Sequence, residues 1–121
     1  MHLSKNFTDD EFRCRCCGAF EDSIVFRAFV ARLQYARDEA GIPFVVTSGY
    51  RCPEHNRAVG GKPDSSHLKA VAADIRAQTD AERYAIITGL LRAGFKRIGI
   101  GKNFIHGDMD ADKPQHLMWV Y

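Results

Sequence analysis

Apolar side chains recur at helical spacing over residues 23–40, which predicts the longest helix of the chain. Its apolar positions are Phe26, Phe29, Val30, Leu33 and Ala40. Asp22 or Ser23 can cap the start, Gly41 is a typical end, and Pro43 prevents the helix from resuming.

Thr79 and Glu82 form a capping box that opens a second helix, which we expect to end at Gly94. Strands are predicted over the β-rich runs 44–47, 71–75, 97–101, 103–109 and 116–121. In the last run, Trp119 and Tyr121 are expected to pack in the core or at an edge, with a groove-lining role as the alternative. This order of elements predicts an α+β fold with a small antiparallel sheet flanked by helices.

Two further segments have no long periodic pattern. Residues 1–20 look like an irregular arm with one helical turn, capped by Thr8 and Glu11. We expect Phe7 and Phe12 to pin this arm to the core. Residues 48–66 are rich in Gly, Pro, Ser and Asp and predict a long loop with one helical turn near 54–58, and such loops are usually functional.

Length and composition fit one domain spanning residues 1–121, since 45% of the side chains are apolar and can form a core. The net charge of +2 is scattered and gives no support for nucleic-acid binding. No apolar run could insert into a membrane, and the polar start of the chain has no signal-peptide core. We therefore expect synthesis in the cytoplasm, and we expect a monomer.

The four cysteines are Cys14, Cys16, Cys17 and Cys52. Their spacing differs from that of a zinc ribbon, and we expect buried or partly buried free thiols. A second, structural metal held by these thiols is the alternative. A cysteine nucleophile at Cys52 beside His55 has little support, because nothing marks a lowered thiol pKa.

Two histidines and an aspartate are the main candidates for a metal site. His67 and Asp74 lie seven positions apart, so they need a turn between them to reach one ion. His106 is placed in the middle of a predicted strand, and Asp108 shares its face. Three protein ligands leave one tetrahedral position open, which is typical of a hydrolytic zinc site.

A series of motifs in fixed order extends this reading. The motifs are Ser48-Gly49-Tyr50-Arg51, Glu54-His55-Asn56, Gly60-Gly61, Ser65-Ser66-His67-Leu68-Lys69, Ala72-Ala73-Asp74-Ile75 and Phe104-Ile105-His106-Gly107-Asp108. In this order the chain resembles the peptidase M15 family of zinc D-alanyl-D-alanine peptidases and phage endolysins, closest to its short subgroup. The resemblance implies the fold shared with the hedgehog signalling domain.

The resemblance also implies roles for single residues. His67, Asp74 and His106 match the family's Zn²⁺ ligands. Ser65 matches a serine that helps to bind substrate, and Arg51 matches an arginine that pairs with a substrate carboxylate or supports the site. A guanidinium suits this task because it offers two parallel donors to a carboxylate.

The chain departs from the family pattern at the proton acceptor. Asn103 stands where several relatives have the glutamate of ExxH, and Phe104 stands where others have the first histidine of HxH. Asp108 is therefore our candidate catalytic base, with orientation of His106 as its other role. Asp110 and His116 are weaker candidates, and Ala70, a glycine in many relatives, is a small change.

The function that follows is a zinc-dependent peptidase acting on the peptide stems or cross-links of bacterial peptidoglycan. It would act on the cell wall, with holin-mediated release if the source is a phage. One alternative is a non-catalytic module of the same fold that binds zinc and murein. Another is a zinc-stabilised structural domain, such as a phage assembly component.

Overall fold

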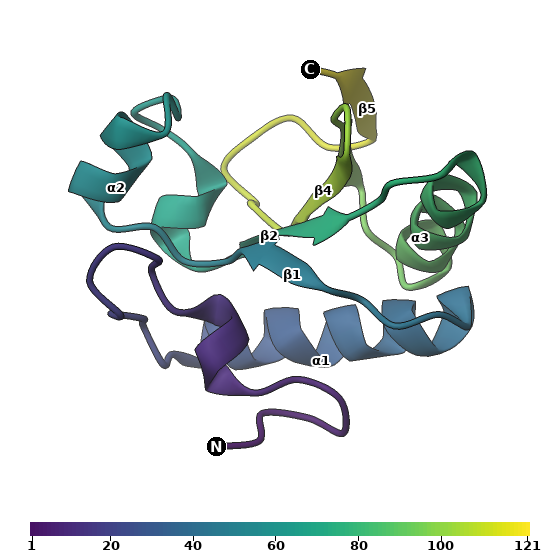
Figure 1. The fold of residues 1–121 in the computed structure, drawn as a ribbon, viewed down its shortest axis with the longest axis horizontal. Coiled ribbons are helices and arrows are strands. Elements are labelled where there is room, and N and C mark those ends of the chain that lie inside the picture. Colours follow the sequence, from purple (N-terminus) through teal and green to yellow (C-terminus); the bar gives the residue numbers. More distant parts are fainter.

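The computed structural model describes residues 1–121, in which three α-helices and two short 3-10 helices accompany a sheet of five strands. The helices are η1 (Asp9–Phe12), α1 (Ile24–Ala40), α2 (Pro53–Ala58), η2 (Ser66–Lys69) and α3 (Asp80–Arg92). The strands are β1 (Val46–Ser48), β2 (Ala72–Arg76), β3 (Arg97–Ile100), β4 (Phe104–Asp108) and β5 (Leu117–Val120). This arrangement confirms the predicted α+β class (Figure 1).

Both long helices begin and end where their capping residues predict. The Ser23 hydroxyl accepts from the Phe26 backbone N–H, and Gly41 ends α1 with a left-handed φ of 72°. Thr79 and Glu82 form the predicted capping box of α3. No helix is both long enough and apolar enough to cross a bilayer.

The sheet has the order β1-β2-β4-β3-β5 and is mixed, so the predicted antiparallel arrangement fails at one strand pair. β5 runs parallel to β3, whereas all other pairs are antiparallel. The reason is that β4 returns the chain to the end of the sheet where β3 begins, and the segment 109–116 crosses that end of β3 before β5 begins. A parallel pair needs a return connection of this kind, and a tight hairpin cannot supply it.

The two faces of the sheet have different roles because side chains alternate along each strand. Ile75, Ile98 and Ile105 belong to the buried core, where α1 and α3 pack against each other and against the sheet (Figure 1). Asp74 and His106 occupy the intervening positions and point to the opposite face. One face of the sheet therefore packs against the hydrophobic core, and the other face carries the polar candidate residues.

The N-terminal arm is tied to this core through aromatic side chains. Phe7 and Phe12 are fully buried, and their rings meet edge-to-face at 5.7 Å. Phe12 also stacks edge-to-face on Phe26 of α1 at 5.5 Å. The predicted capping box of Thr8 and Glu11 is present at η1.

Candidate metal centre

Three buried side chains from three elements meet on the open face of the sheet. Asp74 of β2 lies directly opposite His106 of β4 in the strand register. His67 reaches them from η2, whose last turn closes at Ala70 with a left-handed φ of 58°. The turn predicted between His67 and Asp74 is thus supplied by η2 and Ala70, at a position where glycine would be less strained.

Each histidine has one ring nitrogen held by the protein and one directed at Asp74. Nδ1 of His67 lies 2.7 Å from the Gly49 carbonyl, and its Nε2 lies 3.3 Å from Oδ1 of Asp74. Nδ1 of His106 lies 3.0 Å from the same Oδ1. A carbonyl can only accept, so it fixes the proton of His67 on Nδ1 and leaves the lone pair of Nε2 facing the cluster.

The spacing of these atoms fits a tetrahedral zinc ion. One ligand atom from each of His67, Asp74 and His106 lies within 4.8 Å of the others. Zinc binds histidine nitrogen and carboxylate oxygen at about 2.0–2.1 Å, which places two tetrahedral ligands about 3.3 Å apart. The distances of 3.3 and 3.0 Å to Asp74 agree with this requirement.

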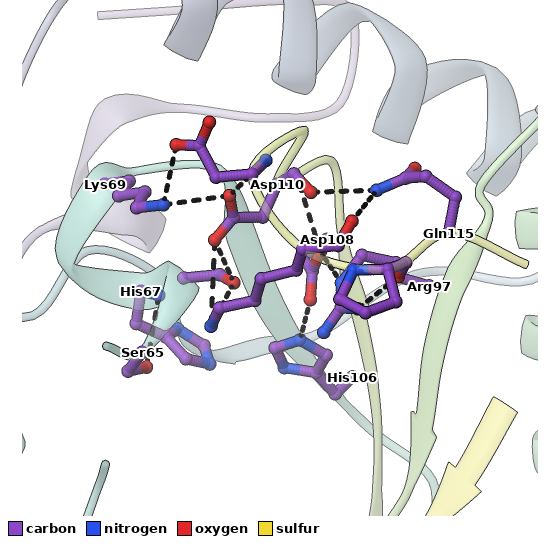
Figure 2. A network of polar contacts seen from close by, with 12 residues as sticks. Ser65, His67, Lys69, Arg97, His106, Asp108, Asp110 and Gln115 are labelled. Carbon is purple, nitrogen blue, oxygen red and sulfur yellow. Dashed lines mark hydrogen bonds and ion pairs between the residues drawn. The ribbon is translucent and has the colours of Figure 1, made fainter. Parts of the chain in front are cut away.

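Asp108 lies on the other side of the His106 ring, away from Asp74. Its Oδ2 is 2.7 Å from Nε2 of His106, and its Oδ1 accepts from Nε of Arg97 at 2.8 Å (Figure 2). The backbone N–H of Asp110 also donates to Oδ1, at 3.1 Å. A carboxylate that receives the second N–H of a metal-binding histidine fixes the ring and raises its basicity.

The position of the family's usual base offers no proton acceptor in this chain. Asn103 precedes β4 in the turn after β3, where it is exposed and its carbonyl accepts from the Ala77 backbone. Both oxygens of Asp108 are engaged, and its side chain is only 1% exposed. Of the two roles predicted for Asp108, this geometry favours the orientation of His106.

The charges in this cluster support one another. Burial raises the pKa of Asp74, but the adjacent imidazoles of His106 and His67 outweigh it and hold the pKa well below the ordinary value. Burial lowers the pKa of His106, but the carboxylates of Asp108 and Asp74 outweigh it and raise the pKa. The pKa of Asp108 is also lowered, because His106, the Asp110 N–H and Arg97 overcome its burial. Both carboxylates therefore remain ionised at neutral pH, as ligation and orientation require.

Arg51 and Ser65, the predicted substrate-binding residues, border this cluster. Nη2 of Arg51 lies 3.4 Å from Oδ2 of Asp74, and its Nε donates to Ser48. Nη1 donates to Asn56, so the guanidinium is fixed beside the metal ligands while part of it remains exposed. The Ser65 hydroxyl accepts from the His67 backbone N–H and caps η2.

Trp119 of β5 and Tyr121, the residue after this strand, form one wall of the site. The ring of Trp119 lies 5.6 Å from that of His106, and the ring of Tyr121 lies 6.4 Å from it. A Cβ at Gly99 would come within 2.7 Å of both Trp119 and Tyr121, so the missing side chain makes room for this wall. Trp119 thus lies on the edge strand β5 and Tyr121 directly after it, as the edge prediction has it, and both rings face His106 rather than the core.

The segment 109–116 is held beside the site by a polar network around Asp110 (Figure 2). Lys69 donates to its Oδ1 at 2.9 Å, and Ser66 donates to its Oδ2 at 2.8 Å. The Gln115 side chain donates to the Asp110 carbonyl at 2.9 Å. This network joins the segment to η2, the element that carries His67.

Sequence reasoning missed two residues that hold the ligands in place. Arg97 is buried, and besides Asp108 it binds the Pro114 carbonyl at 2.6 Å. A charged residue in a short apolar strand, two positions from Gly99, was the available signal for it. The role of Gly49 is carried by its backbone carbonyl, which leaves no trace in residue type.

Comparisons with known proteins agree with this geometry. A family model described as Peptidase M15 matches residues 5–108, which include all three candidate ligands, Arg51 and Ser65. No curated protein matches the chain. The match covers most of the sequence and supports a metallopeptidase in general. The chain belongs to the peptidase M15 family.

Proposed function

We propose that this chain is a zinc-dependent peptidase that hydrolyses peptide stems or cross-links of bacterial peptidoglycan. One observation carries the proposal: two imidazole nitrogens and one carboxylate oxygen converge within 4.8 Å, and protein groups hold the far sides of both rings. This is a three-ligand set of the kind that hydrolytic zinc enzymes use.

The three ligands would be His67 through Nε2, Asp74 through its carboxylate and His106 through Nδ1. When bound, zinc would polarise the peptide carbonyl and lower the pKa of water from about 15.7 towards about 7. The buried setting of these residues strengthens such electrostatic effects, because the local dielectric constant is lower than that of water.

Arg51 supports a substrate with a free carboxylate close to the cleaved bond. Three of its N–H groups bind Ser48, Asn56 and Asp74, and the guanidinium has five donors. The remaining donors can receive a carboxylate of a stem peptide, and Ser65 at the start of η2 can donate to a neighbouring peptide group. This pairing would fix the position of the scissile bond relative to the metal ligands.

Asp108 would act by holding His106. Its contact with Nε2 keeps the proton there and directs Nδ1 towards Asp74, while Arg97 keeps Asp108 in place. Trp119 and Tyr121 would support the substrate as an apolar wall beside His106.

Digestion of purified sacculi tests the proposal, with products identified by mass. The wild-type chain with added zinc is expected to release shortened or unlinked stem peptides, and His106→Ala is expected to release none. His55→Ala is a matched control, because His55 lies outside the cluster. Equal product release by wild type and His106→Ala, or by the chelated and zinc-loaded enzyme, would contradict the proposal.

A second candidate function is a non-catalytic module that binds zinc and murein. It is favoured by Asn103 at the place of the family glutamate and by the engagement of both Asp108 oxygens. Binding to sacculi without new product masses, from a wild-type chain that retains zinc, would establish this function instead.

A further inference from the structure

A second group of metal-ligating side chains lies outside the candidate metal centre. It consists of Cys14, Cys16, Cys17 and Cys52, which are all the cysteines of the chain. The first three lie in the arm after η1, and Cys52 caps the start of α2. Residues 36 positions apart, Cys16 and Cys52, thus face each other.

The four sulfur atoms have the spacing of a tetrahedral thiolate site. All lie within 4.8 Å of one another, and the distances are 3.6 Å for Cys14–Cys16 and 3.4 Å for Cys16–Cys52. Zinc binds thiolate sulfur at about 2.3 Å, which places two tetrahedral ligands about 3.8 Å apart. A disulfide instead requires about 2.05 Å, and all four cysteines are free.

Disulfide pairing explains this geometry less well. Three of the cysteines fall within four consecutive positions, so joining all four in disulfides must link two of these three to each other. Closing so short a loop removes little entropy from the unfolded chain. A metal ion uses all four sulfurs without such a link.

Backbone donors around the cluster also suit thiolates. The Cys52 N–H donates to Sγ of Cys14 and the His55 N–H donates to Sγ of Cys52, both at 3.4 Å. A hydrogen bond from a backbone N–H favours the charged form of its acceptor. Cys16 and Cys17 are exposed, contrary to the expectation of buried or partly buried thiols, so an ion can reach the cluster from solvent.

We propose that Cys14, Cys16, Cys17 and Cys52 bind a second zinc ion in a closed, structural site. Four protein ligands complete the tetrahedron, so this ion would take no part in hydrolysis. It would fasten the arm to the loop that leads into α2, beside which the arm passes (Figure 1).

The position of this site links it to the metal centre. Cys52 directly follows Arg51 and comes three residues after Gly49, whose carbonyl holds His67. The backbone of this loop is also tied to the arm by the bond from the Tyr50 N–H to the Phe12 carbonyl at 2.8 Å. The second ion would therefore stabilise the loop that positions Arg51 and His67.

Zinc content and zinc ligation test this proposal on the full chain, purified with reductant and then freed of excess metal. We expect two zinc ions in the wild type and in His55→Ala, and one in His67→Ala/His106→Ala. X-ray absorption of that double variant should show sulfur ligands alone, at about 2.3 Å. This readout leaves the cysteines intact and does not depend on peptidase activity, so it is independent of the proposed function.

Cys16→Ser and Cys17→Ser are the complementary variants, chosen because both side chains are exposed. Each should lose the sulfur-bound ion, and trypsin should then cleave faster after Arg13 and Arg15 in the arm. The proposal is overturned if the histidine double variant holds no zinc, if its zinc has nitrogen or oxygen ligands, or if masses show disulfides in the reduced preparation.

Discussion

At the scale of single residues, the candidate metal centre depends on the groups behind the ligands. Gly49 fixes the proton of His67, and Asp108 fixes that of His106. Arg97 in turn holds Asp108, at a hydrogen bond of 2.8 Å. The ligands are therefore directed before any ion arrives, which reduces the reorganisation needed on binding.

Asp108→Asn separates the two roles predicted for this residue. If Asp108 orients His106, the variant should bind zinc about 10- to 100-fold more weakly. Activity should then return when zinc is added in excess. Competition with a chromophoric chelator measures the affinity, and Asp112→Asn, at an exposed carboxylate of the following segment 109–116, is the control. Unchanged zinc affinity with activity that excess zinc does not restore would instead identify Asp108 as the base.

Asp110→Asn should destabilise the protein in a pH-dependent manner. Burial raises the pKa of Asp110, but Lys69, Ser66 and the Asp112 N–H outweigh it, so the pKa lies below the ordinary value of 3.8. A lowered pKa stabilises the fold above pH 3.8, and this stabilisation is lost as the pH falls and the carboxylate becomes protonated. We expect the free energy of unfolding to fall by about 1–3 kcal/mol at pH 7 and by less below pH 3.8. Urea unfolding of the wild type and of Asp110→Asn, at pH 7 and at a pH below 3.8, measures this difference in stability. An equal difference at the two pH values would contradict the assignment.

At the scale of elements, two glycines allow neighbouring segments to pack closely around the sheet. Gly89 of α3 is buried where this helix crosses α1, and Gly99 of β3 lies under the aromatic wall. Neither position has a positive φ, so the need for glycine comes from neighbouring atoms. Such close approaches are invisible in the sequence, because they join segments far apart along the chain.

Gly89→Ala should destabilise the protein, although alanine is the better helix former. At an open helix position this substitution would stabilise by about 1 kcal/mol. Here the new Cβ would lie 2.4 Å from the Ala36 carbonyl oxygen and 2.8 Å from Cβ of Ala40. The helices must separate, at a cost of about 1–3 kcal/mol in the free energy of unfolding. Chemical denaturation gives the sign directly, and a stabilised variant would show that α1 and α3 lie further apart than described.

Gly99→Ala should move the aromatic wall without removing a metal ligand. The added Cβ meets Trp119 and Tyr121 at 2.7 Å, so both rings must shift. Trp119 is the only tryptophan, and its fluorescence therefore reports the change. We expect a shifted emission spectrum, a raised KM for stem peptides and unchanged zinc content. An unaltered spectrum and KM would show that these aromatics do not line the substrate site.

At the scale of the whole molecule, the hydrophobic core and the candidate metal centre lie on opposite faces of the sheet. α1 and α3 bury one face, and the other face carries the ligands, Asp108 and the aromatic wall. The metal centre joins β2, β4 and η2, whereas the cysteine cluster joins the arm to the loop before α2. Each cluster thus brings together side chains from segments that lie far apart along the chain.

Much of this plan was present in the local pattern of the sequence. Caps and apolar periodicity predicted α1 and α3 to within a few residues, since those signals lie within the elements themselves. The motif order predicted the family and the three side chains that meet at the candidate metal centre. Strand β5 was predicted over residues 116–121, but its parallel pairing with β3 was missed, because strand order and direction depend on where the segment 109–116 crosses. The roles of Arg97 and Gly49 also depend on tertiary contacts, as does the clustering of the cysteines. The spacing of these residues in the sequence could not predict them.

A crystal structure of the zinc-loaded wild type, with anomalous data collected above and below the zinc absorption edge, tests the central claim most directly. The account predicts an anomalous peak about 2.0–2.1 Å from Nε2 of His67, Nδ1 of His106 and a carboxylate oxygen of Asp74. A fully zinc-loaded crystal without a peak among these three side chains, or with their ligand atoms turned away from one another, would contradict it.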